Sequence, residues 1–268
     1  MNEGYLNPMP RVVAHRGDSK HFPENTMPAF LSAVKMGIDI VETDVHITRD
    51  GVVVIWHDNT LERNTDGHGT VEEHSYDELL QYDAAYTFTK DNGKTFPFRD
   101  TGVKICKLED VLLSCPNQRF NIDLKTKQNG IVEEFIRIVR KCGAENRVCC
   151  ASFHLSNLKS IRRIAPDILT SITTVEVVNL LLRQKLRILP KKIGHGRKII
   201  FQVPERGYGL KVTTPLFVRM MHERGAVIMV WTINEESDMR RLFKLGVDAI
   251  MTDDPSTVIK VAEDMGLR

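Results

Sequence analysis

The sequence lacks several features that would place it in a specialised class. No apolar run approaches the ~20 residues of a membrane-spanning helix. Residues 1–10 lack the basic and then apolar pattern of a secretory signal peptide. A net charge of +2 provides no overall field for nucleic acid. We therefore expect no nucleic-acid partner, and we predict a cytoplasmic location.

Paired cysteine motifs are also absent. The five cysteines stand at positions 106, 115, 142, 149 and 150. Their number is odd and no CxxC spacing occurs, which favours free thiols in a reducing compartment over a disulfide framework or a zinc finger. Hydrophobic residues make up 42% and charged residues 27% of the 268 positions, which is typical of an ordinary globular protein.

Short apolar, β-branched runs recur along the chain, with helical patterns between most of them. Such runs are typical of buried parallel strands. The candidate strands span 11–15, 39–47, 52–57, 119–125, 147–153, 168–173, 198–203, 226–233 and 247–252. Repeated strand–helix units over this length predict an α/β fold, a (β/α)8 TIM barrel, as a single domain over 1–268.

A hairpin accounts for the one surplus strand. Asp50-Gly51 between 39–47 and 52–57 is a two-residue turn signal. In that register Asp44 faces His57, and Glu42 shares the face of Asp44 because side chains alternate along a strand. Residues 58–106 then break the strand–helix rhythm, and we expect a small inserted subdomain there.

Four short motifs place reactive or charged side chains at the predicted strand ends, where the active sites of barrel enzymes lie. His15-Arg16-Gly17, Glu42-x-Asp44, His57-Asp58 and Asp123-x-Lys125 each have an ordinary structural explanation, such as a local ion pair. Together they offer two histidines for proton transfer, carboxylates for a hard divalent cation, and two cations for phosphate. This combination is what phosphodiester cleavage requires.

At these residues the chain resembles the glycerophosphodiester phosphodiesterase family. The resemblance runs from about Val12 to Pro255, and it rests on ordered motifs: HRG at 15–17, PENT at 23–26, ExD at 42–44, HD at 57–58, VWTIN at 230–234 and MTDDP at 251–255. DNGKTFPFR at 91–99 and FQVPE at 201–205 look most like the bacterial cytoplasmic branch.

The resemblance implies a barrel with an insertion after the HD motif and hydrolysis of glycerophosphodiesters to sn-glycerol 3-phosphate and an alcohol. It implies an attack of the glycerol 2-hydroxyl on phosphorus, with a cyclic phosphate that water then opens. By position, the implied roles are acid–base catalysis by His15 and His57, binding of one divalent metal, Mg²⁺ or Ca²⁺, by Glu42, Asp44 and Asp123, and phosphate contact by Arg16 and Lys125. The family usually has Glu-x-Lys where this chain has Asp123-Leu124-Lys125.

Weaker candidates follow the later strands. Trp231, Gln202 and Glu205 are candidates for substrate contact, whereas Asp253 and Asp254 are expected to cap the last helix. His46 is expected to be structural or exposed to solvent, and Asn25 to cap the first helix or to order the site. The segment 177–198 carries seven basic and no acidic residues beside several leucines. It predicts either a barrel helix with a basic face or a peripheral contact with an anionic membrane.

Three alternatives stay open at this point. A lysophospholipase D would apply the same chemistry to lysophospholipids at a membrane surface, and an apolar channel beside the site would favour it. A Schiff-base lyase would use Lys125 as its nucleophile. A catalytically silent barrel would only bind a phosphodiester, although it would not need two histidines. The headgroup preference and the oligomeric state are not specified by the sequence.

Overall fold

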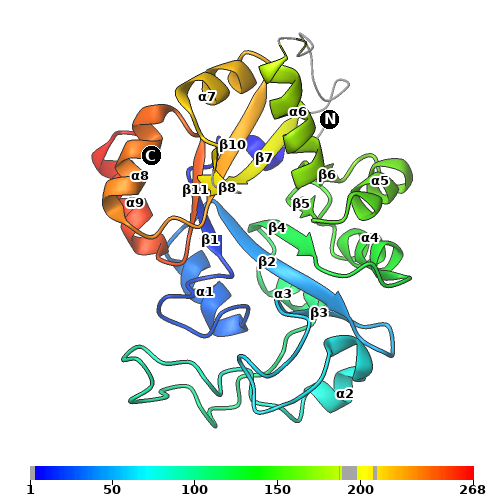
Figure 1. The fold of residues 1–268 in the computed structure, drawn as a ribbon. Helices are drawn as coiled ribbons and strands as arrows, with labels where there is room; N and C mark the ends of the chain where they lie inside the picture. The colour runs from blue at the N-terminus through cyan, green and yellow to red at the C-terminus, as the bar shows by residue number, and fades with distance from the viewer. Residues whose placement is uncertain (1–3, 187, 189–197, 208–209) are drawn as a thin grey trace.

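The computed structural model describes residues 4–186, 188, 198–207 and 210–268. Within these ranges, eight parallel strands form a barrel, and most of the helices lie around its outside (Figure 1). The barrel strands are β1 (Val12–His15), β2 (Ile40–Ile47), β4 (Arg119–Leu124), β5 (Val148–Ala151), β6 (Leu169–Thr170), β7 (Ile199–Pro204), β10 (Ala226–Trp231) and β11 (Ala249–Thr252). The longer helices are α1 (Met27–Lys35), α3 (Leu108–Ser114), α4 (Ile131–Lys141), α5 (Leu155–Ile164), α6 (Thr174–Lys185), α7 (Pro215–His222), α8 (Glu236–Leu245) and α9 (Pro255–Asp264).

The strands are ordered β6-β5-β4-β2-β1-β11-β10-β7. A single parallel bridge between Ser171 and Ile200 joins the two ends of this order, so the barrel is nearly closed. This arrangement confirms the predicted (β/α)8 barrel. A separate two-stranded ribbon, β8 (Arg206–Gly207) and β9 (Leu210–Lys211), follows β7. None of the helices within the described ranges is long and apolar enough to cross a membrane.

The core has an inner and an outer layer because side chains alternate along each strand. Val13, Ile40, Cys149 and Ile200 pack inside the barrel, together with Tyr5 of the short helix η1 (Gly4–Leu6). Their neighbours along the strands pack outward against the helices. Every second side chain points into the barrel, and this alternation continues toward the carboxyl ends of the strands. His15 therefore follows Val13 on β1, and Glu42 and Asp44 follow Ile40 on β2. The residue pattern that fills the core thus aims polar side chains into the barrel mouth.

The hairpin at β2 differs from its predicted register by one residue. β2 pairs with β3 (Val53–Ile55) so that Val45 lies opposite Ile55, and Trp56 N donates to Asp44 O at 3.0 Å. The loop has three residues rather than two. Thr48 N bonds to Val52 O at 2.9 Å, and Gly51 adopts a φ of 84° that favours glycine. Asp44 therefore does not face His57 across the hairpin.

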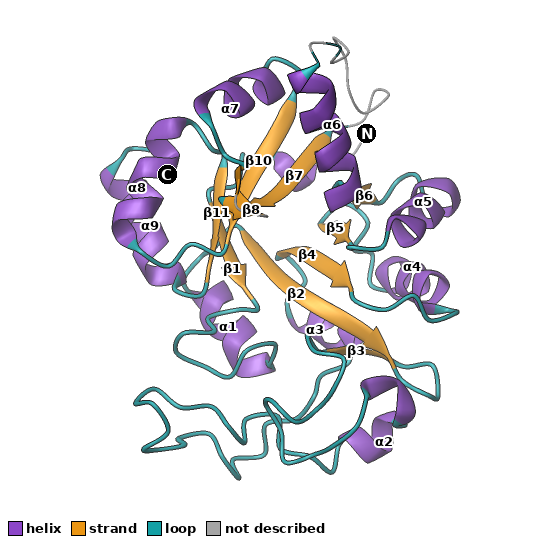
Figure 2. Cartoon of the chain, in the orientation of Figure 1, coloured by secondary structure: helices purple, strands orange, loops and turns teal. Residues whose placement is uncertain are grey.

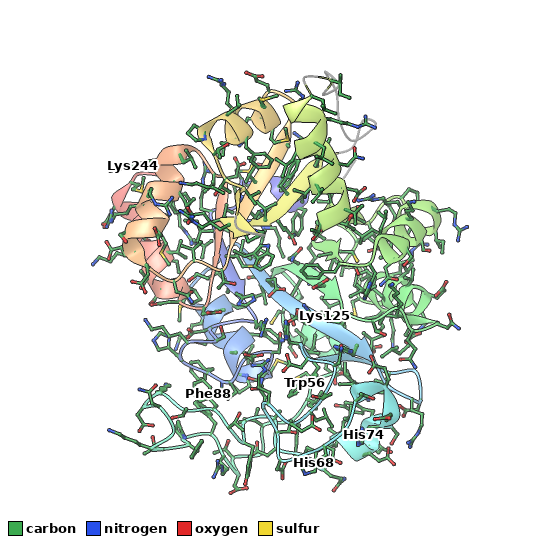
Figure 3. All side chains as sticks on the ribbon, viewed as in Figure 1. Trp56, His68, His74, Phe88, Lys125 and Lys244 are labelled. Atoms are coloured by element: carbon green, nitrogen blue, oxygen red, sulfur yellow. The ribbon has the colours of Figure 1, made fainter. Side chains whose placement is uncertain are left out.

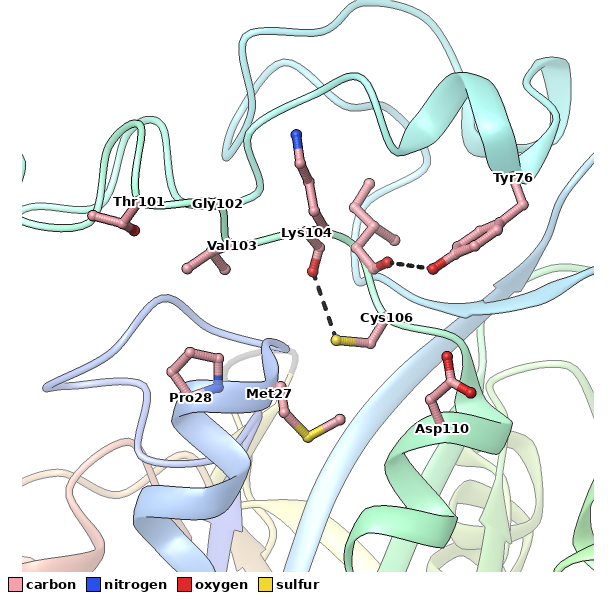
Figure 4. A pocket seen from close by; sticks show the side chains of 10 residues that line it. Met27, Pro28, Tyr76, Thr101, Gly102, Val103, Lys104, Cys106 and Asp110 are labelled. Carbon is pink, nitrogen blue, oxygen red and sulfur yellow. Dashed lines mark hydrogen bonds between the residues drawn. The ribbon is translucent and has the colours of Figure 1, made fainter.

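The inserted segment 58–106 consists mainly of loops, with η2 (Val71–Glu73) and α2 (Tyr76–Leu79) (Figure 2). It has a small apolar cluster of its own that includes Trp56, Leu61 and Leu79. A hollow of about 410 Å³ lies where its last residues approach the start of α1 (Figure 4). There the Cys106 thiol donates to Lys104 O, and Tyr76 Oη donates to Ile105 O.

Only one of the two aspartates predicted to cap the last helix does so. Asp254 accepts hydrogen bonds from Thr257 N at 3.2 Å and Thr257 Oγ1 at 2.7 Å at the start of α9. Burial alone would raise the pKa of Asp254, but bonds from Lys20 and the helix start outweigh it and hold the pKa well below its usual range. Asp253 has a different role, which is described with the site.

Replacing Asp254 by alanine is expected to cost about 0.5–2 kcal/mol of unfolding free energy at pH 7. A carboxyl with a lowered folded pKa stabilises above its unfolded pKa of ~3.9, and it loses that contribution as pH falls through the folded value. The deficit should therefore shrink on acidification, and urea unfolding at pH 7 and pH 3 measures both quantities. Asp264→Ala, at an exposed carboxylate near the end of α9, is the control. An equal effect of both variants would contradict the capping role.

Candidate active site

The carboxyl ends of β1, β2 and β4 bring most of the predicted residues together. The register places His15 beside Glu42, and Asp44 beside Asp123. Arg16 follows β1, and Lys125 follows β4 and is labelled near the centre of the view in Figure 3. Since neighbouring parallel strands end at the same side of a barrel, local sequence motifs as far apart as His15 and Asp123 converge on one site.

His15 is held by a residue that sequence reasoning assigned elsewhere. Its Nδ1 lies 2.6 Å from Asp253 Oδ1, and its Nε2 lies 4.0 Å from Glu42 Oε2. Ser19 Oγ and Asn234 Nδ2 donate to Asp253 at 3.1 and 2.7 Å. Because an ionised carboxylate only accepts, Nδ1 carries the hydrogen. Burial would lower the pKa of His15, but Asp253 and Glu42 raise it above the usual value.

The prediction that Asp253 caps the last helix is therefore wrong. The physical reason is that the side chain of Asp254 already satisfies the first turn of α9, while Asp253 is turned back toward the imidazole. The sequence did carry a signal for the true role of Asp253, because this residue comes directly after β11 and the carboxyl ends of barrel strands are where active-site residues lie.

Asp253→Asn is expected to lower kcat about tenfold or more with a smaller change in KM. An amide does not hold the His15 ring in the tautomer that the carboxylate fixes, so catalysis should suffer more than binding. Steady-state kinetics of the variant and of the surface variant Asp264→Asn measure this difference. A change in KM alone would show that Asp253 does not position the histidine.

The two site cations lie among three buried carboxylates. Lys125 Nζ is 2.8 Å from both Asp44 Oδ1 and Asp123 Oδ2. Arg16 Nε is 3.4 Å from Asp44 Oδ2, and the Arg16 amide donates to Glu42 Oε2 at 3.2 Å. Burial alone would raise the pKa of Asp44, but Lys125 and Arg16 outweigh it and lower the value. For Lys125 the two aspartates outweigh burial and raise the pKa.

Asn25 orders this cluster rather than capping the first helix. Its Nδ2 donates to Asp44 Oδ2 at 2.8 Å, and its Oδ1 accepts from Thr43 Oγ1 at 2.8 Å. Its φ of 57° lies in the left-handed region, which asparagine tolerates better than most residues. The N-cap position of α1 belongs to Thr26.

For two of the three carboxylates, Glu42 and Asp123, the nearby positive charges do not offset the effect of burial on the pKa. Burial and the nearby Asp44 raise the pKa of Glu42 to about 7. Burial also raises the pKa of Asp123, whose Oδ1 is buried and has no hydrogen-bond partner in the described part of the chain. Oxygen ligands of this kind fit a hard divalent cation. Within the same described ranges, however, no three His, Cys, Asp or Glu side chains are arranged to hold a metal ion, since Lys125 lies between Asp44 and Asp123.

His57 reaches the same cavity from the end of the hairpin. Its Nδ1 lies 2.5 Å from Asp58 Oδ1, and its backbone carbonyl is 3.3 Å from His46 Nε2. His46 is fully buried, and its Nδ1 lies 2.8 Å from Glu72 Oε1, which fits the structural alternative and not the solvent-exposed one. Burial, Lys125 and Arg16 lower the pKa of His57 despite the opposing effect of Asp44.

The inserted segment is tied to the site through Arg63, which sequence reasoning missed. Its Nη2 and Nη1 lie 2.6 and 3.0 Å from the two oxygens of Glu24, and its Nε contacts Asp58. Glu24 in turn accepts from Arg16 Nη1 at 2.8 Å. Alternating charges therefore connect Arg16, Glu24, Arg63, Asp58 and His57. No local motif marks Arg63, because its partners come from two distant segments.

All eight site residues predicted from the sequence line one cavity of about 750 Å³. They are His15, Arg16, Glu42, Asp44, His57, Asp123, Lys125 and Trp231. Of the weaker candidates, Gln202 lines the cavity and exchanges side-chain hydrogen bonds with Asn121. Glu205 instead lies 2.8 Å from Arg241 and 3.7 Å from Lys211. Of the basic segment, residues 187 and 189–197 lie outside the described residues.

Comparison with known proteins places this site in context. Residues 15–257 match the model of the glycerophosphoryl diester phosphodiesterase family. A glycerophosphodiester phosphodiesterase of Caldanaerobacter subterraneus subsp. tengcongensis is 32% identical, over 95% of this chain and 98% of the relative. A lysophospholipase D of Homo sapiens is 27% identical, over 91% of this chain and 83% of the relative. The crystal structure of a glycerophosphodiester phosphodiesterase from Agrobacterium tumefaciens superposes with a TM-score of 0.76 at 25% identity, over 95% of this chain and all of that one.

Proposed function

The chain belongs to the glycerophosphoryl diester phosphodiesterase family and is a phosphoric diester hydrolase, and from that premise we propose that it works by His15 and His57 with one divalent metal. The products are sn-glycerol 3-phosphate and an alcohol. The observation that carries the proposal is that two histidines, each held at Nδ1 by an aspartate, line one cavity with Arg16 and Lys125. Each ring is thereby oriented, and its Nε2 is left for a reactant.

The reaction proceeds in two proton-transfer stages. One histidine takes the proton of the glycerol 2-hydroxyl as its oxygen attacks phosphorus, and the other gives a proton to the departing alcohol oxygen. In the second stage water opens the cyclic phosphate, and the histidines exchange roles. Arg16 and Lys125 face the phosphate oxygens and offset the negative charge that develops on them.

Glu42, Asp44 and Asp123 would hold the metal, Mg²⁺ or Ca²⁺, with Asp44 and Asp123 exchanging their contacts with Lys125 for the cation. The support is their chemistry: three buried carboxylates, one of them with an unpartnered oxygen among the described residues. When bound, the cation supplies further positive charge against the phosphate. Asp123 is one methylene shorter than glutamate, so the preference between the two metals is a quantity to measure on this chain.

The test is enzyme-coupled detection of sn-glycerol 3-phosphate released from glycerophosphocholine, with EDTA and then with Mg²⁺ or Ca²⁺ restored. We expect release to stop with the chelator and to return with metal. Asp123→Asn should shift the metal titration to higher concentration, and an unchanged titration would remove Asp123 from the metal site. Full activity in EDTA would overturn the metal requirement while leaving the hydrolase assignment in place.

The Schiff-base lyase is the less suitable alternative. A lysine nucleophile must be neutral, whereas two carboxylates at 2.8 Å keep the Lys125 ammonium charged. The lysophospholipase D alternative depends on what lines the rest of the cavity.

A further inference from the structure

Two amide side chains that the proposed mechanism does not use line the cavity. Gln202 Nε2 donates to Asn121 Oδ1 at 2.5 Å, and Asn121 Nδ2 donates to Gln202 Oε1 at 3.2 Å. Asn121 lies on β4 and Gln202 on β7, with β5 and β6 between them in the strand order, so the pair crosses the interior of the barrel. Ile200, two residues before Gln202, already belongs to the apolar inner core. The two amides therefore form a polar floor of the cavity above that core.

Each of the two amides keeps unused hydrogen-bonding capacity. A side-chain amide has two N–H donors and an oxygen with two lone pairs, and the reciprocal pair uses one donor and one lone pair of each residue. Asn121 is 1% exposed, whereas Gln202 is only partly buried, so Gln202 is the member that a ligand in the cavity can reach. Asn121 contacts both the nitrogen and the oxygen of the Gln202 amide, and it thereby fixes the plane of that amide.

The chemistry of this amide is complementary to a hydroxyl group. The amide is neutral and offers both a donor and an acceptor, and a hydroxyl likewise donates one hydrogen and accepts another. A phosphate oxygen only accepts, and Arg16 and Lys125 already serve it. A glycerophosphodiester has two hydroxyls on its glycerol. The 2-hydroxyl is the proposed nucleophile, so the terminal hydroxyl is the one that the residues assigned so far do not recognise.

The depth of the pair in the barrel fits this hydroxyl. Asn121 lies beside Glu42 in the register, and it precedes Asp123 by two residues on the same inward face of β4. Two residues along a strand rise about 7 Å, which is comparable with the reach of a glycerol chain from its phosphate. A phosphate held at Lys125, which contacts Asp123, thus leaves room for the glycerol chain between the phosphate and the amide pair.

We propose that Gln202, held in place by Asn121, binds the terminal hydroxyl of the glycerol moiety and so determines specificity for a free glycerol end. The inference rests on the proposed function, because it places that substrate in the same site. Gln202 is the contact residue, and Asn121 is a positioning residue that acts through it. In a 1-acyl lysophospholipid the same oxygen carries an acyl group and has no hydrogen to donate to Gln202. The amide pair therefore favours the glycerophosphodiester over such a substrate.

The test compares choline release from glycerophosphocholine and from 2-hydroxypropyl phosphocholine of the matching configuration. The second compound keeps the attacking 2-hydroxyl and lacks only the terminal one. Both reactions give the same detected product, so the ratio of the two kcat/KM values isolates the terminal hydroxyl. We expect the protein to favour glycerophosphocholine about tenfold or more, because the analogue leaves hydrogen-bonding groups of a desolvated amide without a partner.

Variants of the pair test whether the amides cause this preference. The double variant Asn121→Leu/Gln202→Met replaces both partners by apolar groups of similar size, which is the substitution of a buried hydrogen-bonded pair that costs least stability. We expect it to bring the ratio to within about threefold of one, mainly by lowering kcat/KM for glycerophosphocholine. Asn121→Leu alone should also lower the ratio, because it leaves the Gln202 amide unheld.

Gln118→Met is the matched control for these variants. Gln118 is a buried glutamine just before β4, where its Nε2 donates to Asp39 O at 3.0 Å, and it is not part of the cavity wall. It should leave the ratio unchanged, and thermal unfolding shows that each variant retains the fold. An equal fall of the ratio in Gln118→Met would overturn the inference, since the preference would then not depend on the amide pair.

The remaining outcomes separate the inference from the function on which it rests. Choline from neither substrate, with metal supplied, would overturn the proposed function and the inference together. Equal kcat/KM values for the two substrates would overturn the inference and leave the hydrolase function standing. A tenfold preference that the folded double variant retains would show that the terminal hydroxyl is bound elsewhere, and it would overturn the inference in the same way.

Discussion

Replacing either His15 or His57 by alanine is expected to lower kcat by ~10²-fold or more. Both rings line the cavity, and each has an aspartate on Nδ1, so removing either ring removes one of the two proposed proton transfers. If the two histidines act as a pair in one reaction, kcat of the double variant should be little lower than that of the poorer single variant. Losing one histidine already interrupts the series of proton transfers.

The measurement is steady-state hydrolysis of glycerophosphocholine, with thermal unfolding of each variant to show that the fold is retained. His222→Ala is the control, since His222 ends α7 and pairs with Asp248 at 2.8 Å, outside the cavity lining. Near-normal activity of the folded His15 variant would remove that residue from the chemistry, and the same applies to His57.

Lys125→Met should be the variant that loses most stability, about 3–5 kcal/mol at neutral pH. The ammonium lies 2.8 Å from one oxygen each of Asp44 and Asp123, which are 1% and 6% exposed. Without it the two buried carboxylates adjoin with less opposing charge, because Asp44 keeps only the bond from Asn25 and the nearby Arg16 among the contacts described above. The folded pKa of Asp44 would then rise, and that of Asp123, already raised, would rise further above the unfolded value of ~3.9. The deficit should therefore shrink as pH falls and the carboxyls take up protons.

Urea unfolding between pH 7 and pH 4 measures the loss and its pH dependence. Lys141→Met is the control, because Lys141 is an exposed partner of Glu109 at 2.6 Å, and exposed ion pairs contribute about 0–1 kcal/mol. An equally small loss for Lys125→Met would show that the buried carboxylates do not depend on the lysine.

The alternation of side chains along the strands explains why so much of the site could be predicted. Glu42 and Asp44 share a face with Ile40 along β2, and Asp123 follows Asn121 on β4 in the same way, so an apolar pattern also locates the polar groups. Such information is local, and it depends only on the alternation of side chains.

The residues that escaped prediction depend on tertiary geometry. The hairpin register depends on the Thr48 hydroxyl, which accepts from Val52 N at 2.9 Å and favours a three-residue loop. Asp253 and Asp254 are identical in type and adjacent, and only the position of His15, 238 residues away, assigns different roles to them. The apolar side chains that line the cavity, among them Phe153, Val178 and Leu182, come from α6 and from a loop in a separate part of the chain, so no single motif could reveal them.

The position of Arg63 limits how the inserted segment can be exchanged. A foreign segment grafted onto this barrel would have to provide a guanidinium at the same place. Otherwise Glu24 and Asp58 would lose the cation that both contact, Glu24 would hold Arg16 more strongly, and Asp58 would orient His57 less firmly. A redesigned insertion must therefore supply a cation for these two carboxylates before it can be used to change substrate preference.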